Sequence, residues 1–347
     1  MNPFADFKSV RSSEEILETA IKRASKIKKH FSPRLSKISR IKKEEVAKVK
    51  VLTQNITKPL NKLIKQMPTL SKIDPFYQEL TEILVGIDKL RKTLASLSGS
   101  VRVIKNIADQ HIRRIRKTTN LGVITSERKA AYGRIASVMK KLQGRMVFLK
   151  EVFRLLRRLP STDPGVLTIA VGGPPNVGKS TFVKAVSTAK PEIAAYPFTT
   201  RELIIGHIQL DKQRIQIIDL PGLLDRPLGM RNAIELQAIT ALKHLANVII
   251  FVIDPSETSG YPINNQLSLF HEIKTTFEKI PTIPVINKID LASRQQMQNV
   301  REKMKGVSEM VATEGIGIRE LLQKALEVLT LSQEQQTSTE LERDSFD

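Results

Sequence analysis

One segment near the middle of the chain constrains the fold more than any other feature. Residues 173–180 read GPPNVGKS, which matches the phosphate-loop pattern G-x-x-x-x-G-K-[S/T]. A β-rich run at 166–171 precedes the segment, and a helical stretch at 181–187 follows it. In that setting the N–H groups from Asn176 to Ser180 can meet phosphate oxygens at a helix N-terminus. The segment therefore predicts the strand–loop–helix unit of a P-loop α/β fold.

The side chains of this loop predict how a nucleotide and a metal ion would be bound. Lys179 would reach the β- and γ-phosphates, and the Ser180 hydroxyl would bind Mg²⁺. Gly173 and Gly178 let the backbone turn tightly around a phosphate. In this loop, the residues that we expect to contact the nucleotide are Gly173, Asn176, Val177, Gly178, Lys179, Ser180 and Thr181.

Short β-rich runs alternate with helical stretches over residues 165–330. This alternation predicts a mostly parallel sheet with helices on both faces. A turn at 211–213 separates two of the runs, so these two should form a hairpin. The final residues, 331–347, are polar and non-periodic, which predicts a disordered tail. The β-rich runs are 166–171, 203–210, 214–218, 248–253 and 283–286.

Two polar motifs follow predicted strands of this domain. Asn287-Lys288-Ile289-Asp290 comes after the run 283–286. A carboxylate there can accept from the guanine N1–H and N2–H₂ groups together, whereas adenine lacks that pair of donors, so the motif favours guanine. Asp219-Leu-Pro-Gly222 ends the run 214–218. Asp219 would act on Mg²⁺ through a water, and the Gly222 N–H would sense the γ-phosphate.

A threonine between the phosphate loop and Asp219 is needed to complete Mg²⁺ coordination. Thr200 is the first choice and Thr199 the second. The predicted metal ligands are therefore Ser180, Thr200 and Asp219.

The N-terminal part of the chain reads as a basic helical bundle over residues 1–160. Ser12 and Glu15 have capping-box spacing. Two sets of apolar residues recur at steps of three and four, which places each set on one stripe of a helix. Residues 1–160 hold 37 Lys and Arg against 13 Asp and Glu, whereas the remainder holds 19 against 22. Such asymmetry predicts that this half meets a polyanion. The two stripes are Leu80, Ile83, Ile87, Leu90, Leu94, Leu97 and Met139, Leu142, Met146, Leu149, Phe153, Leu156.

With these motifs in order, the sequence resembles the Obg–HflX group of GTPases, and within it the archaeal form of the nucleolar GTP-binding protein family. The stretches that carry the resemblance are GGPPNVGKST, YPFTTRELIIGHI, IIDLPGLLDRPLGMRNAIELQAITALKHL, DPSETSGYPINNQLSLF and NKID. The resemblance implies a magnesium-dependent GTPase that assists assembly of the large ribosomal subunit. It also implies a fifth motif at Ala312 and Thr313, where the alanine N–H would meet the guanine O6; the serine expected before that alanine is here Val311.

Hydrolysis is expected to be slow. Leu223 stands where many GTPases place a glutamine that orients the attacking water. The family resemblance offers Asn176 as a residue that would help to bind an accelerating K⁺ ion, and the alternative is that this asparagine only caps the loop. The expected catalytic set is Lys179, Thr200, Gly222 and Asn176.

The leading functional hypothesis is a GTP-driven switch that binds ribosomal RNA in a large-subunit precursor. The alternatives are a membrane-surface GTPase and a protein-interaction module that binds GTP with negligible hydrolysis. The longest apolar run, Val248–Ile253, is far below the ~20 residues that span a membrane, so no stable membrane insertion is expected. The chain has no cysteine, which fits a reducing cytoplasm. The oligomeric state is left open.

Overall fold

The computed structural model describes residues 2–27, 36–163, 166–195, 202–210, 213–219, 224–230, 235–236, 239, 241–304 and 306–330. The chain divides into two compact units. One comprises Pro3–Ile73 and Leu84–Arg157. The other comprises Met1–Asn2, Asp74–Ile83 and Arg158–Asp347.

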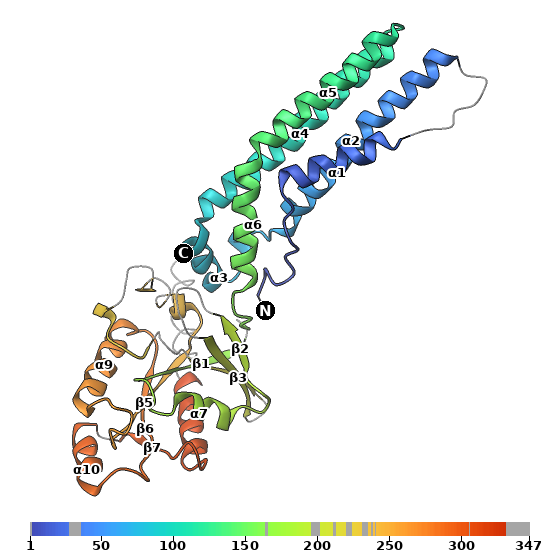
Figure 1. The fold of residues 1–347 in the computed structure, drawn as a ribbon. Coiled ribbons are helices and arrows are strands. Elements are labelled where there is room, and N and C mark those ends of the chain that lie inside the picture. Colours follow the sequence, from blue (N-terminus) through green and yellow to red (C-terminus); the bar gives the residue numbers. More distant parts are fainter. Residues whose placement is uncertain are drawn as a thin grey trace, which may run out of the picture. The chain divides into compact units, whose positions relative to one another are not determined.

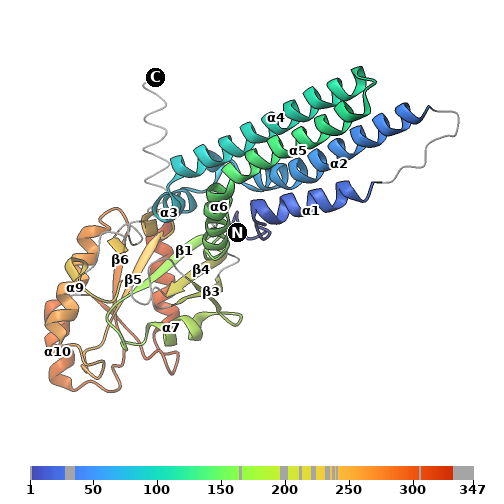
Figure 2. The same cartoon turned by 45° about the horizontal axis from the view of Figure 1, so that its top comes forward.

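The first unit is helical. Long helices α1 (Ser13–Ser25), α2 (Lys37–Gln66), α4 (Ile87–Lys117) and α5 (Leu121–Lys141) lie side by side, and α6 (Gln143–Arg157) follows α5 (Figures 1 and 2). A single turn of 3-10 helix covers Leu70–Lys72. The capping box predicted at the start of α1 is present, because Ser12 and Glu15 bond to each other's backbone N–H groups. One cluster of buried side chains joins α2, α4 and α5.

Neither predicted apolar stripe lies on one helix, so that part of the prediction is wrong. The second runs from the end of α5 into α6, which Leu142 separates, although all six of its residues are buried. The first is divided at Gly86. Gly86, with φ of 72°, separates α3 (Pro75–Val85) from α4. A residue in the left-handed conformation cannot continue a right-handed helix, so α3 ends at this glycine although the apolar spacing continues past it.

The second unit is built on a seven-stranded sheet in the order β2-β3-β4-β1-β5-β6-β7. The strands are β1 (Leu167–Gly172), β2 (Glu192–Ala195), β3 (Glu202–Leu210), β4 (Gln213–Asp219), β5 (Val248–Ile253), β6 (Thr282–Ile286) and β7 (Ser308–Glu309). β3 and β4 form the predicted antiparallel hairpin, and β2 adds to its edge antiparallel. All other pairs are parallel. The mostly parallel sheet is thus confirmed.

Helices cover both faces of this sheet (Figure 2). Val248, Ile250 and Val252 of β5 share a core with α7 (Lys179–Val186) and with the helical residues 318–330. The intervening β5 residues point the other way, and there Phe251 contacts Phe270 of α9 (Ile263–Thr276), with ring centroids 5.5 Å apart. Helix α10 (Arg294–Lys303) begins at a capping box. Short 3-10 turns cover Leu228–Met230 and Leu242–His244.

Residues 74–83 belong to the sheet unit, although the sequence placed them in a helical domain of residues 1–160. Their anchor is Tyr77, whose buried hydroxyl donates to the Pro160 carbonyl (2.9 Å) and accepts from the Thr162 N–H (3.1 Å). Burial raises the pKa of this phenol. Glu79 contacts His244 at 2.8 Å. These long-range contacts explain why a helical segment leaves the bundle.

Candidate functional site

The phosphate loop connects β1 to α7, as predicted. Gly173 has φ of 132°, and a Cβ there would lie 2.4 Å from the Val252 carbonyl oxygen. Only glycine fits so close to a neighbouring strand. Asn176 is exposed in the left-handed region at φ of 62°, and Val177 is fully buried. Within the loop, the side chain of Val177 is therefore buried in the core, and that of its neighbour Asn176 faces solvent.

Lys179 is the first residue of α7, and its side chain folds back over the loop. Its Nζ donates to the carbonyl oxygens of Gly173 (2.8 Å) and Pro174 (2.6 Å). The residue is only 7% exposed, so the loop encloses its ammonium group. Thr181, two residues on, is exposed on α7.

The predicted metal ligands Ser180 and Asp219 are brought together. β4 is the neighbour of β1, with Val171 opposite Asp219, so the end of β4 lies beside the loop. The Ser180 hydroxyl donates to the Asp219 carboxylate, which is fully buried. A hydroxyl and a carboxylate in contact are hard oxygen donors that suit Mg²⁺. Thr199, Thr200, Gly222 and Leu223 lie outside the residues that the structure describes.

Asn287, the residue that follows β6, connects the guanine motif to the phosphate loop and to the fifth motif. Its Nδ2 donates to the Val177 carbonyl of the phosphate loop (2.8 Å), and its Oδ1 accepts from the Ala312 N–H (3.0 Å). Gly178 lies so close that a Cβ would stand 2.2 Å from this Nδ2. The buried asparagine thus fixes the loop and the fifth motif at one edge of the sheet.

The other residues expected to meet the base, in the guanine motif (Asn287–Asp290) and in the fifth motif, differ in exposure. The Asp290 side chain is exposed, and none of the described residues hydrogen-bonds its carboxylate. Ala312 is buried and Thr313 is exposed. Val311, in place of the serine expected from the family, is buried and pairs with Ile316 in an isolated bridge. The predicted alanine therefore lies beside the motif, but its N–H is engaged by Asn287.

Sequence reasoning missed one residue that this region depends on. Asp254 directly follows β5 and is fully buried. It pairs with Lys288 Nζ at 2.9 Å. Burial alone would raise the pKa of this carboxyl, but hydrogen bonds from Ser256 and the Lys288 ammonium lower it below its ordinary value. The available signal was its place at the head of the family-specific stretch DPSETSG.

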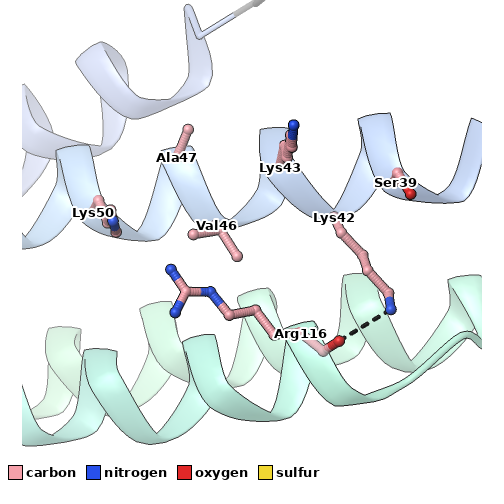
Figure 3. Close-up of a pocket in the computed structure, with 7 residues that line it drawn as sticks. All are labelled: Ser39, Lys42, Lys43, Val46, Ala47, Lys50 and Arg116. Carbon is pink, nitrogen blue, oxygen red and sulfur yellow. Dashed lines mark hydrogen bonds between the residues drawn. The ribbon is translucent and has the colours of Figure 1, made fainter. Parts of the chain in front are cut away.

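A separate basic groove lies between α2 and α4 in the helical unit (Figure 3). Its volume is about 460 Å³. Lys42 reaches across and donates to the Arg116 carbonyl oxygen at 3.0 Å, while the Arg116 guanidinium extends toward Lys50 (Figure 3). The nearby acids are committed elsewhere, because Glu44 and Glu45 pair with Lys48 and Arg128. The lining residues are Ser39, Lys42, Lys43, Val46, Ala47, Lys50 and Arg116.

Comparison with known proteins identifies the family. The model of the NOG1 N-terminal helical domain matches residues 4–163, and the model of nucleolar GTP-binding protein 1 matches residues 233–290. An uncharacterized protein of Methanocaldococcus jannaschii is 37% identical over 298 residues, which cover 86% of this chain and 83% of that protein. The chain belongs to the nucleolar GTP-binding protein 1 family. Membership confirms the resemblance read from the sequence, and it supports GTP binding on the P-loop fold.

The match covers only part of the eukaryotic relatives. The Drosophila melanogaster protein is 38% identical over 265 residues, which cover 76% of this chain and 41% of that protein. The Caenorhabditis elegans protein is 32% identical, and the match covers 96% of this chain and 48% of that protein. The chain therefore spans less than half of either relative. A solved structure of nucleolar GTP-binding protein 1 from Plasmodium falciparum is 36% identical, with a TM-score of 0.46, and covers 53% of this chain and 97% of that one.

Proposed function

We propose that this protein binds GDP and GTP with Mg²⁺ and hydrolyses GTP slowly. The observation that carries the proposal is the pair of hydrogen bonds by which Asn287 contacts the phosphate loop and the Ala312 N–H. Three residues later, the exposed Asp290 carboxylate has no partner among the described residues. A phosphate cradle and a free acceptor at one sheet edge are the two halves of a guanine nucleotide site.

Each half has a distinct chemical role. The Asp290 carboxylate would accept from guanine N1–H and N2–H₂, and adenine would leave it unpaired. Lys179 would leave the loop carbonyls and neutralise the β- and γ-phosphates. Mg²⁺ bound by Ser180, Thr200 and Asp219 would neutralise charge on the triphosphate. Leu223 cannot orient a water, so intrinsic hydrolysis is expected to be slow; Asn176 would hold a K⁺ ion that accelerates it.

A base swap tests guanine recognition. Xanthine carries a carbonyl in place of the guanine 2-amino group, so an amide at position 290 would match xanthine and a carboxylate matches guanine. Calorimetry with Mg²⁺ should show that the protein prefers GDP to ADP and that Asp290→Asn prefers XDP to GDP. Equal affinity of the unmodified protein for GDP and ADP would overturn the proposal.

The proposed role of GTP binding is that of a switch on a large ribosomal subunit precursor. The groove between α2 and α4 supports contact with RNA, because it gathers four cations, Lys42, Lys43, Lys50 and Arg116, that lack acidic partners among the described residues. With aromatic residues at 5% of the chain, backbone recognition is favoured over base stacking. The relatives' name, nucleolar GTP-binding protein 1, places those eukaryotic proteins in the nucleolus, which is consistent with action on a ribosomal precursor.

A salt series tests the RNA contact. The triple variant Lys43→Ala, Lys50→Ala, Arg116→Ala should bind ribosomal RNA less tightly and lose roughly two to three units of the log–log salt slope, about 0.7–0.9 for each of the three lost phosphate contacts. A triple alanine variant of exposed Lys140, Lys141 and Arg145 removes the same charge from α5 and α6 and serves as the control. Equal losses in both variants would show diffuse attraction instead of a groove.

The alternatives give different outcomes. Binding to anionic vesicles in preference to RNA would indicate a membrane-surface GTPase, although among the described residues no helix combines the length and apolar composition of a membrane span. Single-turnover hydrolysis that stays negligible with ribosomal precursor particles would indicate a static GTP-binding module.

A further inference from the structure

The buried carboxylate of Asp254 stands beside the guanine motif because of strand order. β5 and β6 are parallel neighbours, and Ile253 pairs with Ile286. The residues that follow each strand, Asp254 and Asn287, therefore leave the sheet together. Asn287 N–H also donates to the Ile253 carbonyl (2.8 Å). The loop after β5 and the motif at 287–290 therefore begin side by side.

Asp254 is held by its own loop and by Gln266 of α9. Its carboxylate accepts from the Ser256 N–H (3.0 Å), the Ser259 N–H (2.9 Å) and the Thr258 hydroxyl (3.1 Å). The buried Gln266 side chain clamps its backbone, because Oε1 accepts from the Asp254 N–H and Nε2 donates to its carbonyl, both at 2.8 Å. These hydrogen bonds hold the Asp254 carboxylate in one orientation.

Among the described residues, the ammonium of Lys288 is the group from outside this loop that binds the Asp254 carboxylate. The Nζ–Oδ2 distance is 2.9 Å, and the same Nζ donates to Thr258 Oγ1 at 3.0 Å. Lys288 has φ of 59°, a left-handed conformation that costs a non-glycine residue free energy. The two contacts of its ammonium group tie this turn to the loop after β5. The exposed Asp290 follows two residues later.

We propose that Asp254 is a positioning residue for guanine recognition: by anchoring Lys288 it holds the turn at 287–290 in the conformation that aims Asp290 at the base. The inference rests on the proposed function. It assigns base selectivity in part to the DPSETSG loop, which itself need not touch the nucleotide.

GDP against IDP is the informative comparison. Hypoxanthine retains N1–H but lacks the 2-amino group, so the ratio of the two affinities reports how well Asp290 is placed. Asp254→Asn keeps the size of the side chain and removes the charge that holds Lys288, but its NH₂ group also replaces an oxygen that accepts from a backbone N–H group; Lys288→Met leaves those acceptors in place. The GDP:IDP affinity ratio of Asp254→Asn should fall about tenfold, the scale of one charge-assisted hydrogen bond. Lys288→Met should lower the ratio similarly, and the double variant should be no worse than either single variant, because the two residues act as a pair.

Thr168→Val provides the matched control. Thr168 is also buried and hydrogen-bonded, but it lies at the start of β1, away from the loop ends of the strands. Its loss should destabilise the unit and leave the GDP:IDP ratio unchanged. An unchanged ratio in Asp254→Asn, or additive effects in the double variant, would overturn the inference. If the unmodified protein itself fails to prefer GDP to ADP, the proposed function fails first, so the two failures are distinguishable.

Discussion

Replacing Gly178 by alanine tests how the phosphate loop and the guanine motif depend on each other. Gly178 has φ of 102°, and a Cβ would lie 2.2 Å from Asn287 Nδ2. Backbone strain should cost about 1–2 kcal/mol. The displaced asparagine would also lose its bonds to the Val177 carbonyl and the Ala312 N–H, at about 1 kcal/mol each. The free energy of unfolding should therefore fall by about 3–4 kcal/mol.

Gly306→Ala separates strain from collision. Gly306 has φ of 68°, but a Cβ there would meet nothing within 4 Å, so only the strain of about 1–2 kcal/mol should appear. Urea unfolding followed by circular dichroism measures both variants, and calorimetry measures GDP binding. Gly178→Ala should also weaken GDP at least tenfold, whereas Gly306→Ala should not. If Gly178→Ala were no less stable than Gly306→Ala and bound GDP normally, the coupling through Asn287 would be refuted.

Tyr77→Phe should lower the free energy of unfolding by about 1–3 kcal/mol, because the Pro160 carbonyl and Thr162 N–H lose a buried partner; an unchanged urea midpoint would contradict this. The depressed pKa of Asp254, below its ordinary 3.8, means that its stabilising contribution is present above pH 3.8 and is lost as pH falls through the folded-state value. The stability difference between the unmodified protein and Asp254→Asn should therefore shrink below pH 3.8 in acid-unfolding curves. GTP hydrolysis should be faster in KCl than in NaCl at equal ionic strength if Asn176 helps to bind K⁺, and equal rates would remove that role.

The helical unit illustrates how far periodicity reaches. Spacing predicted that the six apolar residues from Met139 to Leu156 are buried, and they are, but it did not predict the helix break at Leu142. The stripe from Leu80 to Leu97 had the same spacing, yet Gly86 divides it. Spacing alone does not report φ, and the contacts of Tyr77 with residues 160–162 lie more than 80 positions away in the sequence.

The sequence by itself determined the P-loop fold, the β3–β4 hairpin and the placing of the nucleotide motifs at strand ends. These follow from local patterns, because glycine, lysine and hydroxyl positions in a phosphate loop and alternating apolar runs act over a few residues. Tertiary structure alone decided that Asn287 bonds Val177, 110 positions away, and that Asp254 holds Lys288. Such pairs depend on which strands become neighbours in the sheet, and strand order is set by packing of the whole domain instead of by any short segment.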